Sequence, residues 1–65
     1  MLVIKAKDRN MYIAEDTVDD KYYITKRLFI AKDFKWSWLF FSKKVFLEGI
    51  QNKFPEFKWE YQRVK

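Results

Sequence analysis

The chain has 65 residues, with 14 Lys or Arg against nine Asp or Glu, and a formal net charge of +5. This length suits one small domain, which we expect to span residues 1–65. Cys and His are both absent. Their absence excludes disulfides, thiolate or imidazole metal ligands, and a histidine general base. We therefore expect neither a cofactor nor a metal site.

The chain is rich in aromatic residues, with seven Phe, four Tyr and three Trp. A domain of about 60 residues buries only about 60% of the surface that its unfolded chain exposes, and each aromatic ring brings about 150–250 Å² to be buried. We therefore expect some rings to remain exposed, and exposed aromatic patches usually mark a contact with another molecule.

The first 31 residues favour strands. Leu2, Ile4 and Ala6 alternate with other residues, a polar turn follows at 8–10, and 11–14 are apolar again. This pattern predicts an N-terminal β-hairpin. Residues 21–31 are rich in β-formers and predict a further strand. A rival interpretation of the same stretch is a helix capped by Asp16 or Thr17, with one face made of Val18, Tyr22, Thr25 and Phe29.

A helix is predicted from about residue 38 or 43 to residue 54. Residues 34–41 fit both strand and helix spacing and leave its start open, whereas Pro55 ends it. Gly49 inside this helix costs roughly 1 kcal/mol relative to Ala, and one reason to keep it would be close approach of another backbone. The apolar face of the helix consists of Val45, Phe46, Leu47, Ile50 and Phe54. After Pro55, alternating aromatic residues from Phe57 predict a final strand.

These elements predict an α+β fold, a small antiparallel sheet of three to four strands with one helix packed on one face. The sheet begins with the N-terminal hairpin. In this arrangement the helix residues Phe46, Ile50 and Phe54 face strand residues, which we expect to be Leu2, Ile4, Ile24 and Leu28.

Catalysis finds no support in the residue pattern. The acidic run 15–20 holds four carboxylates, but it lacks the spacing and the Gly of a calcium-binding loop, so we interpret it as a solvated loop. Ser37 and Ser42 have no histidine to activate them. Glu56 and Glu60 would lie roughly 13 Å apart on a strand, too far for joint acid–base work. We therefore expect no catalytic residues and no enzyme activity.

Basic residues surround the aromatic ones in two stretches. One stretch lies around the two tryptophans at 36 and 38, and the other lies around the tryptophan at 59. Trp and Tyr anchors with a charged rim are typical of protein interfaces, and cations beside rings are typical of single-stranded nucleic-acid sites. The predicted partner-binding residues are Trp36, Trp38, Lys35, Lys43, Lys44, Trp59, Tyr61 and Arg63.

The leading hypothesis is a small basic, non-enzymatic protein that docks on another protein through exposed aromatics. Its residue types are favoured by AT-rich codons, which suits a phage- or virus-encoded modulator or inhibitor of a host protein. The alternative is a nucleic-acid-binding protein, which we rank second because Lys outnumbers Arg and the acidic run would repel phosphate. No apolar run approaches the roughly 20 residues of a membrane span. We expect a cytoplasmic location, in the host for a phage product, and a two-fold homodimer.

Overall fold

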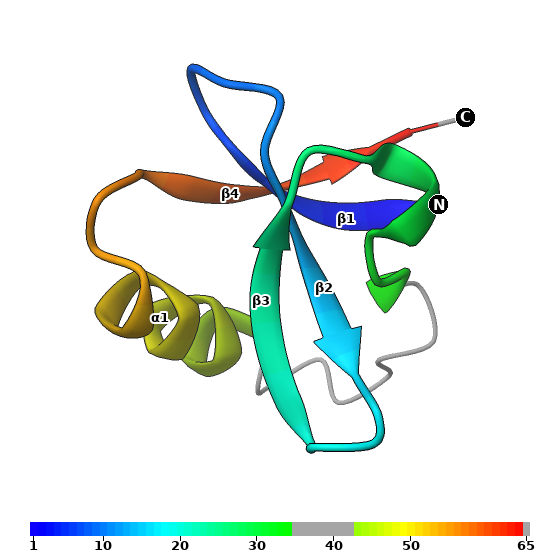
Figure 1. Ribbon diagram of the computed structural model, residues 1–65. Helices are drawn as coiled ribbons and strands as arrows, with labels where there is room; N and C mark the ends of the chain where they lie inside the picture. The colour runs from blue at the N-terminus through cyan, green and yellow to red at the C-terminus, as the bar shows by residue number, and fades with distance from the viewer. Residues whose placement is uncertain (35–42, 65) are drawn as a thin grey trace.

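The computed structural model describes residues 1–34 and 43–64 and contains four strands and one α-helix (Figure 1). The strands form one antiparallel sheet in the order β3-β2-β1-β4. The predicted α+β fold, its N-terminal hairpin and its single helix are thus confirmed. The elements are β1 (Leu2–Ala6), β2 (Tyr12–Asp16), β3 (Lys21–Thr25), the 3₁₀ helix η1 (Leu28–Ile30), α1 (Lys43–Lys53) and β4 (Trp59–Arg63).

The sheet consists of two strand pairs that cross at a steep angle (Figure 1). β1 pairs with β4 along its whole length, and β2 pairs with β3 along its whole length. Between β1 and β2 the register joins only Lys5 and Tyr12, next to the loop that connects them. The two pairs therefore diverge beyond this point and leave an opening between β1 and β2.

Residues 31–34 fill that opening. The backbone N–H of Lys32 donates to the carbonyl of Ile13 at 3.0 Å, which gives β2 a hydrogen-bond partner where β1 has moved away. The carboxylate of Asp33 accepts a hydrogen bond from the backbone N–H of Leu2, also at 3.0 Å. The next side chain, Phe34, is 2% exposed and enters the core. These hydrogen bonds stabilise the fold, because a buried backbone N–H or carbonyl group without a partner costs free energy.

The core lies between the two strand pairs and α1, and it is largely aromatic. The ring of Phe34 lies 5.3 Å from that of Phe46 and 6.0 Å from that of Tyr61, centroid to centroid. Trp59 is 4% exposed and lies edge-on to Phe57 at 5.7 Å. Such edge-to-face pairs add to the stabilisation from buried area. The buried members of the cluster are Ile4, Ala6, Ile13, Phe34, Ile50 and Trp59.

The predicted strand over residues 21–31 is too long. β3 ends at Thr25, whose hydroxyl accepts a hydrogen bond from the N–H of Arg27, and the chain then forms η1. Leu28 is half-buried and lies outside the core cluster, contrary to the predicted contact with the helix. The rival interpretation of this stretch as a helix from Asp16 or Thr17 is wrong as well, because Lys21–Thr25 pairs with β2.

The helix begins at Lys43 among the described residues and runs to Lys53, just before Pro55 as predicted. Close approach of another backbone, the reason considered for Gly49, is not found among the described residues. Gly49 is exposed, and a Cβ built on it meets no atom within 4 Å outside its own helix. Within residues 1–34 and 43–64 no backbone approaches this glycine closely, so there it weakens the helix without a packing gain. No helix in the described part of the chain is long and apolar enough to span a membrane.

Candidate partner-binding surface

The most exposed aromatic side chain in the described residues is Phe29, on η1. It is 78% exposed, and its neighbour Ile30 is 38% exposed. None of the three residues of η1 is buried. Lys26 and Arg27, directly before this turn, are exposed as well. We call Lys26, Arg27, Phe29 and Ile30 the η1 surface, and it combines apolar side chains with a positive rim.

The backbone beneath the η1 surface is held at both ends. Within the turn, the N–H of Ile30 donates to the carbonyl of Arg27 at 3.1 Å, and the N–H of Ala31 donates to the carbonyl of Leu28 at 3.0 Å. Ala31 is 6% exposed, and the Lys32–Ile13 hydrogen bond follows directly. Phe29 thus projects from an ordered turn, and an anchor that is already in place loses less conformational entropy on binding.

The side chain of Lys32 does not belong to the η1 surface. Its ammonium pairs with the carboxylate of Glu15 at 2.6 Å and lies 5.7 Å from the centroid of the Phe34 ring. Lys32 therefore stabilises the segment that carries η1 and is not a free cation for a partner. The pKa of the nearby Tyr22 phenol is raised, first by burial and then by the charge of Glu15.

Of the predicted partner-binding residues, Trp59 lies in the core. Its indole N–H donates to the carbonyl of Phe54 at 2.9 Å, and its backbone N–H donates to the side chain of Gln51 at 3.0 Å. Only 4% of Trp59 is exposed. Its ring surface is used to join β4 to the end of α1, so we leave it out of the candidate surface.

Tyr61 is half-buried and packs inside as well. Its ring lies edge-on to Phe34, and its hydroxyl donates to the carbonyl of Lys43 at 2.9 Å. Burial raises the pKa of this phenol above its ordinary value. The hydrogen bond ties the first described turn of α1 to β4, so Tyr61 sets the position of Lys43.

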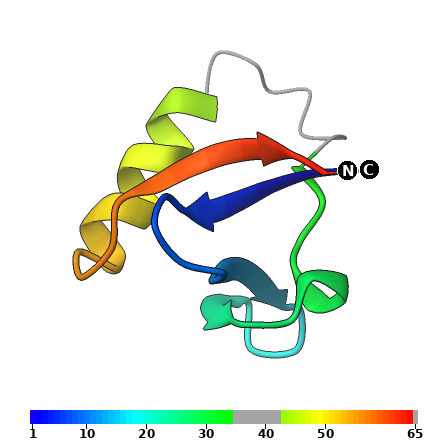
Figure 2. The same ribbon diagram turned by 90° about the horizontal axis from the view of Figure 1, so that it is seen from above.

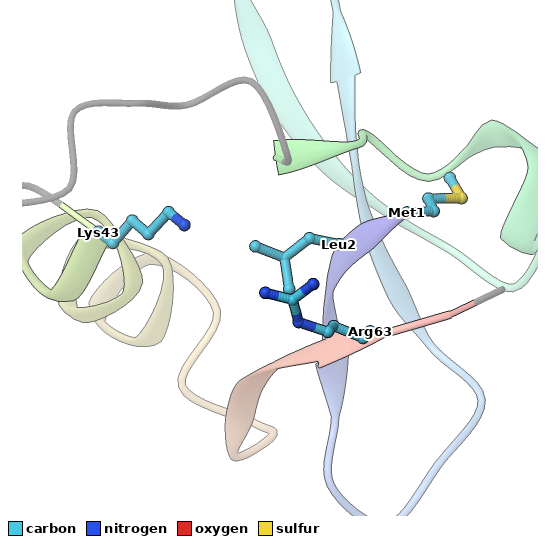
Figure 3. Close-up of a pocket in the computed structure, with 4 residues that line it drawn as sticks. All are labelled: Met1, Leu2, Lys43 and Arg63. Atoms are coloured by element: carbon cyan, nitrogen blue, oxygen red, sulfur yellow. The ribbon is translucent and has the colours of Figure 1, made fainter.

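Two of the predicted cations line the same hollow although they are distant in sequence. Lys43 at the beginning of α1 and Arg63 at the end of β4 line one hollow of about 100 Å³, together with Met1 and Leu2 (Figure 3). Lys44 is exposed on the next position of α1. Lys35, Trp36 and Trp38 lie outside the described residues, so their part in partner binding stays a prediction.

A second hollow lies at the β1–β2 loop and measures about 190 Å³. There the guanidinium of Arg9 lies 5.4 Å from the centroid of the Phe57 ring, a cation–π arrangement. Both hollows are smaller than the roughly 300–1,000 Å³ of typical small-molecule pockets. The hollow at the β1–β2 loop is lined by side chains of both charges: Lys7, Asp8, Arg9, Glu56 and Lys58.

The acidic residues form a tight turn between β2 and β3. The carboxylate of Asp16 accepts hydrogen bonds from the N–H groups of Val18 and Asp19, at 3.0 and 3.3 Å. Asp20 has a φ of 54°, the left-handed conformation that Asp tolerates in turns. Within residues 1–34 and 43–64, no three His, Cys, Asp or Glu side chains gather as metal ligands would. The carboxylate of Asp16 stabilises the turn through its two hydrogen bonds to the backbone.

Sequence reasoning missed Phe29 as a surface residue. Its β-forming neighbours assigned it to a strand, where every second residue would be covered. The available signal was the Lys26-Arg27 pair immediately before Leu28, because two adjacent cations mark a solvent-facing stretch of chain. That signal indicates where the sheet ends, but it does not by itself show that Phe29 remains outside.

In comparisons with known proteins, no family model, no curated protein and no solved structure matches this chain.

Proposed function

We propose that this chain is a non-enzymatic binding protein that docks on another protein through the η1 surface. The observation that carries the proposal is the 78% exposure of Phe29 on a turn whose neighbours on both sides are held by hydrogen bonds. A large aromatic side chain left in water costs hydrophobic free energy, which burial in a partner's pocket recovers. Rigid aromatic anchors are typical binding hot spots.

The partner that fits this surface is a protein with an apolar pocket inside an acidic rim. Lys26 and Arg27 supply positive charge next to Phe29, and the whole chain carries a net charge of +5. Complementary charge speeds the encounter and fixes orientation. The acidic turn at 16–20 lies at the other end of β3 from Lys26 (Figure 1). An acidic partner surface can therefore approach η1 without facing the acidic turn.

Nucleic acid is the second candidate, because a ring beside two cations also suits stacking on a base. The distance of the acidic turn from Lys26 and Arg27 favours this alternative. Sites for single strands, however, stack successive bases on several rings. On the η1 surface Phe29 is the only ring, and its neighbour Ile30 is aliphatic. An aromatic next to an aliphatic side chain fits a protein pocket better, so we place the protein partner first.

As to origin, the residue types favoured by AT-rich codons support a phage- or virus-encoded modulator of a host protein. The test is a capture experiment from the lysate of the cell in which the protein occurs, with and without nuclease. We expect wild type to retain a protein after nuclease treatment and Phe29→Ala to lose it. If the wild-type protein loses the captured molecules after nuclease treatment, its ligand is nucleic acid and not a protein.

The matched control for this capture is Val45→Ala. Val45 is 64% exposed on α1, which lies on the opposite side of the molecule from η1 (Figures 1 and 2). Both variants remove an exposed apolar side chain, but only one alters the η1 surface. Equal loss of the captured protein in the two variants would show non-specific hydrophobic adsorption and would contradict the proposal.

A further inference from the structure

Among the described residues, the hollow is lined by Met1, Leu2, Lys43 and Arg63, and the two charged side chains of this set, Lys43 and Arg63, are both positive. Figure 3 shows the ammonium of Lys43 and the guanidinium of Arg63 approaching the side chain of Leu2 from two sides. Within residues 1–34 and 43–64, the one ion pair joins Lys32 to Glu15. Among the described residues, neither Lys43 nor Arg63 forms an ion pair. The carboxylate of Asp33 accepts a hydrogen bond from the backbone N–H of Leu2 at 3.0 Å, but Asp33 is not among the described residues that line the hollow.

The fold imposes this convergence. Tyr61 and Arg63 point to the same face of β4 because side chains alternate along a strand, and the hydroxyl of Tyr61 holds the carbonyl of Lys43. Arg63, one step further along that face, is thereby placed beside the Lys43 side chain. Leu2 pairs with Arg63 across the sheet and forms the apolar wall. Two positive charges that line one hollow favour an anion bound between them.

We propose that this hollow binds a phosphate group. A phosphate monoester carries a charge of about −1.5 to −2 at pH 7, which two cations match, whereas a carboxylate would neutralise only one. Arg offers a fork of donors that suits phosphate oxygens, and Lys offers a point charge. The volume of about 100 Å³ is well above the roughly 10–15 Å³ that one water molecule requires, so the hollow has space for a small anion.

The contrast with the second hollow supports the assignment. That hollow is larger, about 190 Å³, and it includes Lys7, Arg9 and Lys58, but Asp8 and Glu56 line it as well. Its cations already have carboxylates nearby, so an added anion gains less there. The phosphate site also shares no residue with the η1 surface, so it stands whether or not Phe29 binds a protein.

The test is a titration with inorganic phosphate, at constant ionic strength maintained with chloride, followed by the amide NMR signals of the protein. We expect the signals of Leu2, Lys43 and Arg63 to shift in a saturable way. Lys43→Gln and Arg63→Gln should each weaken the affinity by about tenfold or more, the loss of one charge-assisted hydrogen bond. Lys58→Gln, which removes the same charge from the second hollow, should change it less than about twofold.

A parallel titration with methyl phosphate distinguishes the source of the group. Binding of both compounds indicates a phosphorylated molecule as the ligand, and binding of inorganic phosphate alone indicates the free ion. Thermal denaturation in chloride checks that all three variants are folded; Lys58 and Arg63 are exposed and Lys43 is half-buried. The proposal is overturned if wild type shows no saturable shifts, or if Lys58→Gln weakens binding as much as Lys43→Gln does.

Discussion

The backbone N–H of Lys32 donates to the carbonyl of Ile13 at 3.0 Å, where β1 has diverged from β2. This hydrogen bond joins the segment after η1 to the middle of the sheet. Together with the Asp33–Leu2 hydrogen bond and the buried ring of Phe34, it fixes the position of the turn that carries Phe29. The same segment therefore buries one phenylalanine and exposes another.

Phe29 and Phe34 should respond in opposite ways to truncation. Phe29→Ala should change the free energy of unfolding by less than about 0.5 kcal/mol, since the side chain is solvated. Phe34→Ala should cost about 3–5 kcal/mol and unfold much of the population of a domain this small. Urea denaturation followed by Trp fluorescence measures both. An unfolded Phe29→Ala protein would mean that this ring belongs to the core.

Gly49→Ala should stabilise the protein by about 1 kcal/mol, because Ala favours the helix and no described residue beyond the local helix backbone lies within 4 Å of the new methyl group. The measurement is the midpoint of thermal or urea unfolding. Glu48→Ala, at the adjacent exposed position, is the control and should change stability by less than about 0.5 kcal/mol. A destabilised Gly49→Ala variant would reveal a contact at Gly49 that the described residues do not make.

Gln51 joins α1 to the beginning of β4. Its side-chain amide donates to the carbonyl of Phe57 at 2.6 Å and accepts from the backbone N–H of Trp59 at 3.0 Å. Gln51→Ala leaves both backbone groups unpaired and should cost about 1–3 kcal/mol. Asn52→Ala, at an exposed neighbouring position, should be nearly neutral. Equal effects in calorimetric unfolding would contradict this role of Gln51.

The stability of the protein should fall above pH 10 in a way that depends on Tyr61. Burial raises the pKa of its phenol above 10.0 in the folded chain. Below that pH both states hold the proton, so the contribution is fully present. As the pH rises from about 10, the unfolded chain loses its proton first, and the contribution is lost through the folded pKa.

Tyr61→Phe isolates this effect. At pH 8 wild type should be more stable by about 1 kcal/mol, the worth of the hydrogen bond to Lys43. Between pH 10 and the folded pKa the gap between the two proteins should narrow, because Phe does not titrate. Urea unfolding at a series of pH values measures the gap, and a constant gap across that range would contradict the burial of the phenol.

Local patterns in the sequence predicted the hairpin, the helix and the last strand, because alternation and Pro55 act within a few residues. They did not predict η1. The β-forming Leu28–Ile30 stretch leaves the sheet because Lys32 and Asp33 bond to residues far away in the chain, which no short window contains. Likewise, alternation showed that Trp59 shares a face with Tyr61, but only packing against α1 decides that this face is buried.

The same distinction between local patterns and long-range contacts applies to the candidate site residues. The convergence of Lys43 and Arg63 depends on the register of β1 with β4, which the sequence does not specify, and it emerges only from the fold. The exposure of Phe29 is likewise a tertiary property. The sequence indicated a binding protein with basic and aromatic residues. Which aromatic ring lies at the surface could be identified only from the structure.

The most direct test of the docking surface is photo-crosslinking from position 29. Phe29 is replaced by benzoylphenylalanine, which keeps the phenyl ring and reacts on irradiation with groups in direct contact. In a nuclease-treated lysate we expect a crosslink to an acidic protein from position 29, and none from the same group at Val45. A crosslink only to a second copy of the chain would make η1 a homodimer interface. That result, or equal crosslinking from both positions, would contradict docking on a partner through Phe29.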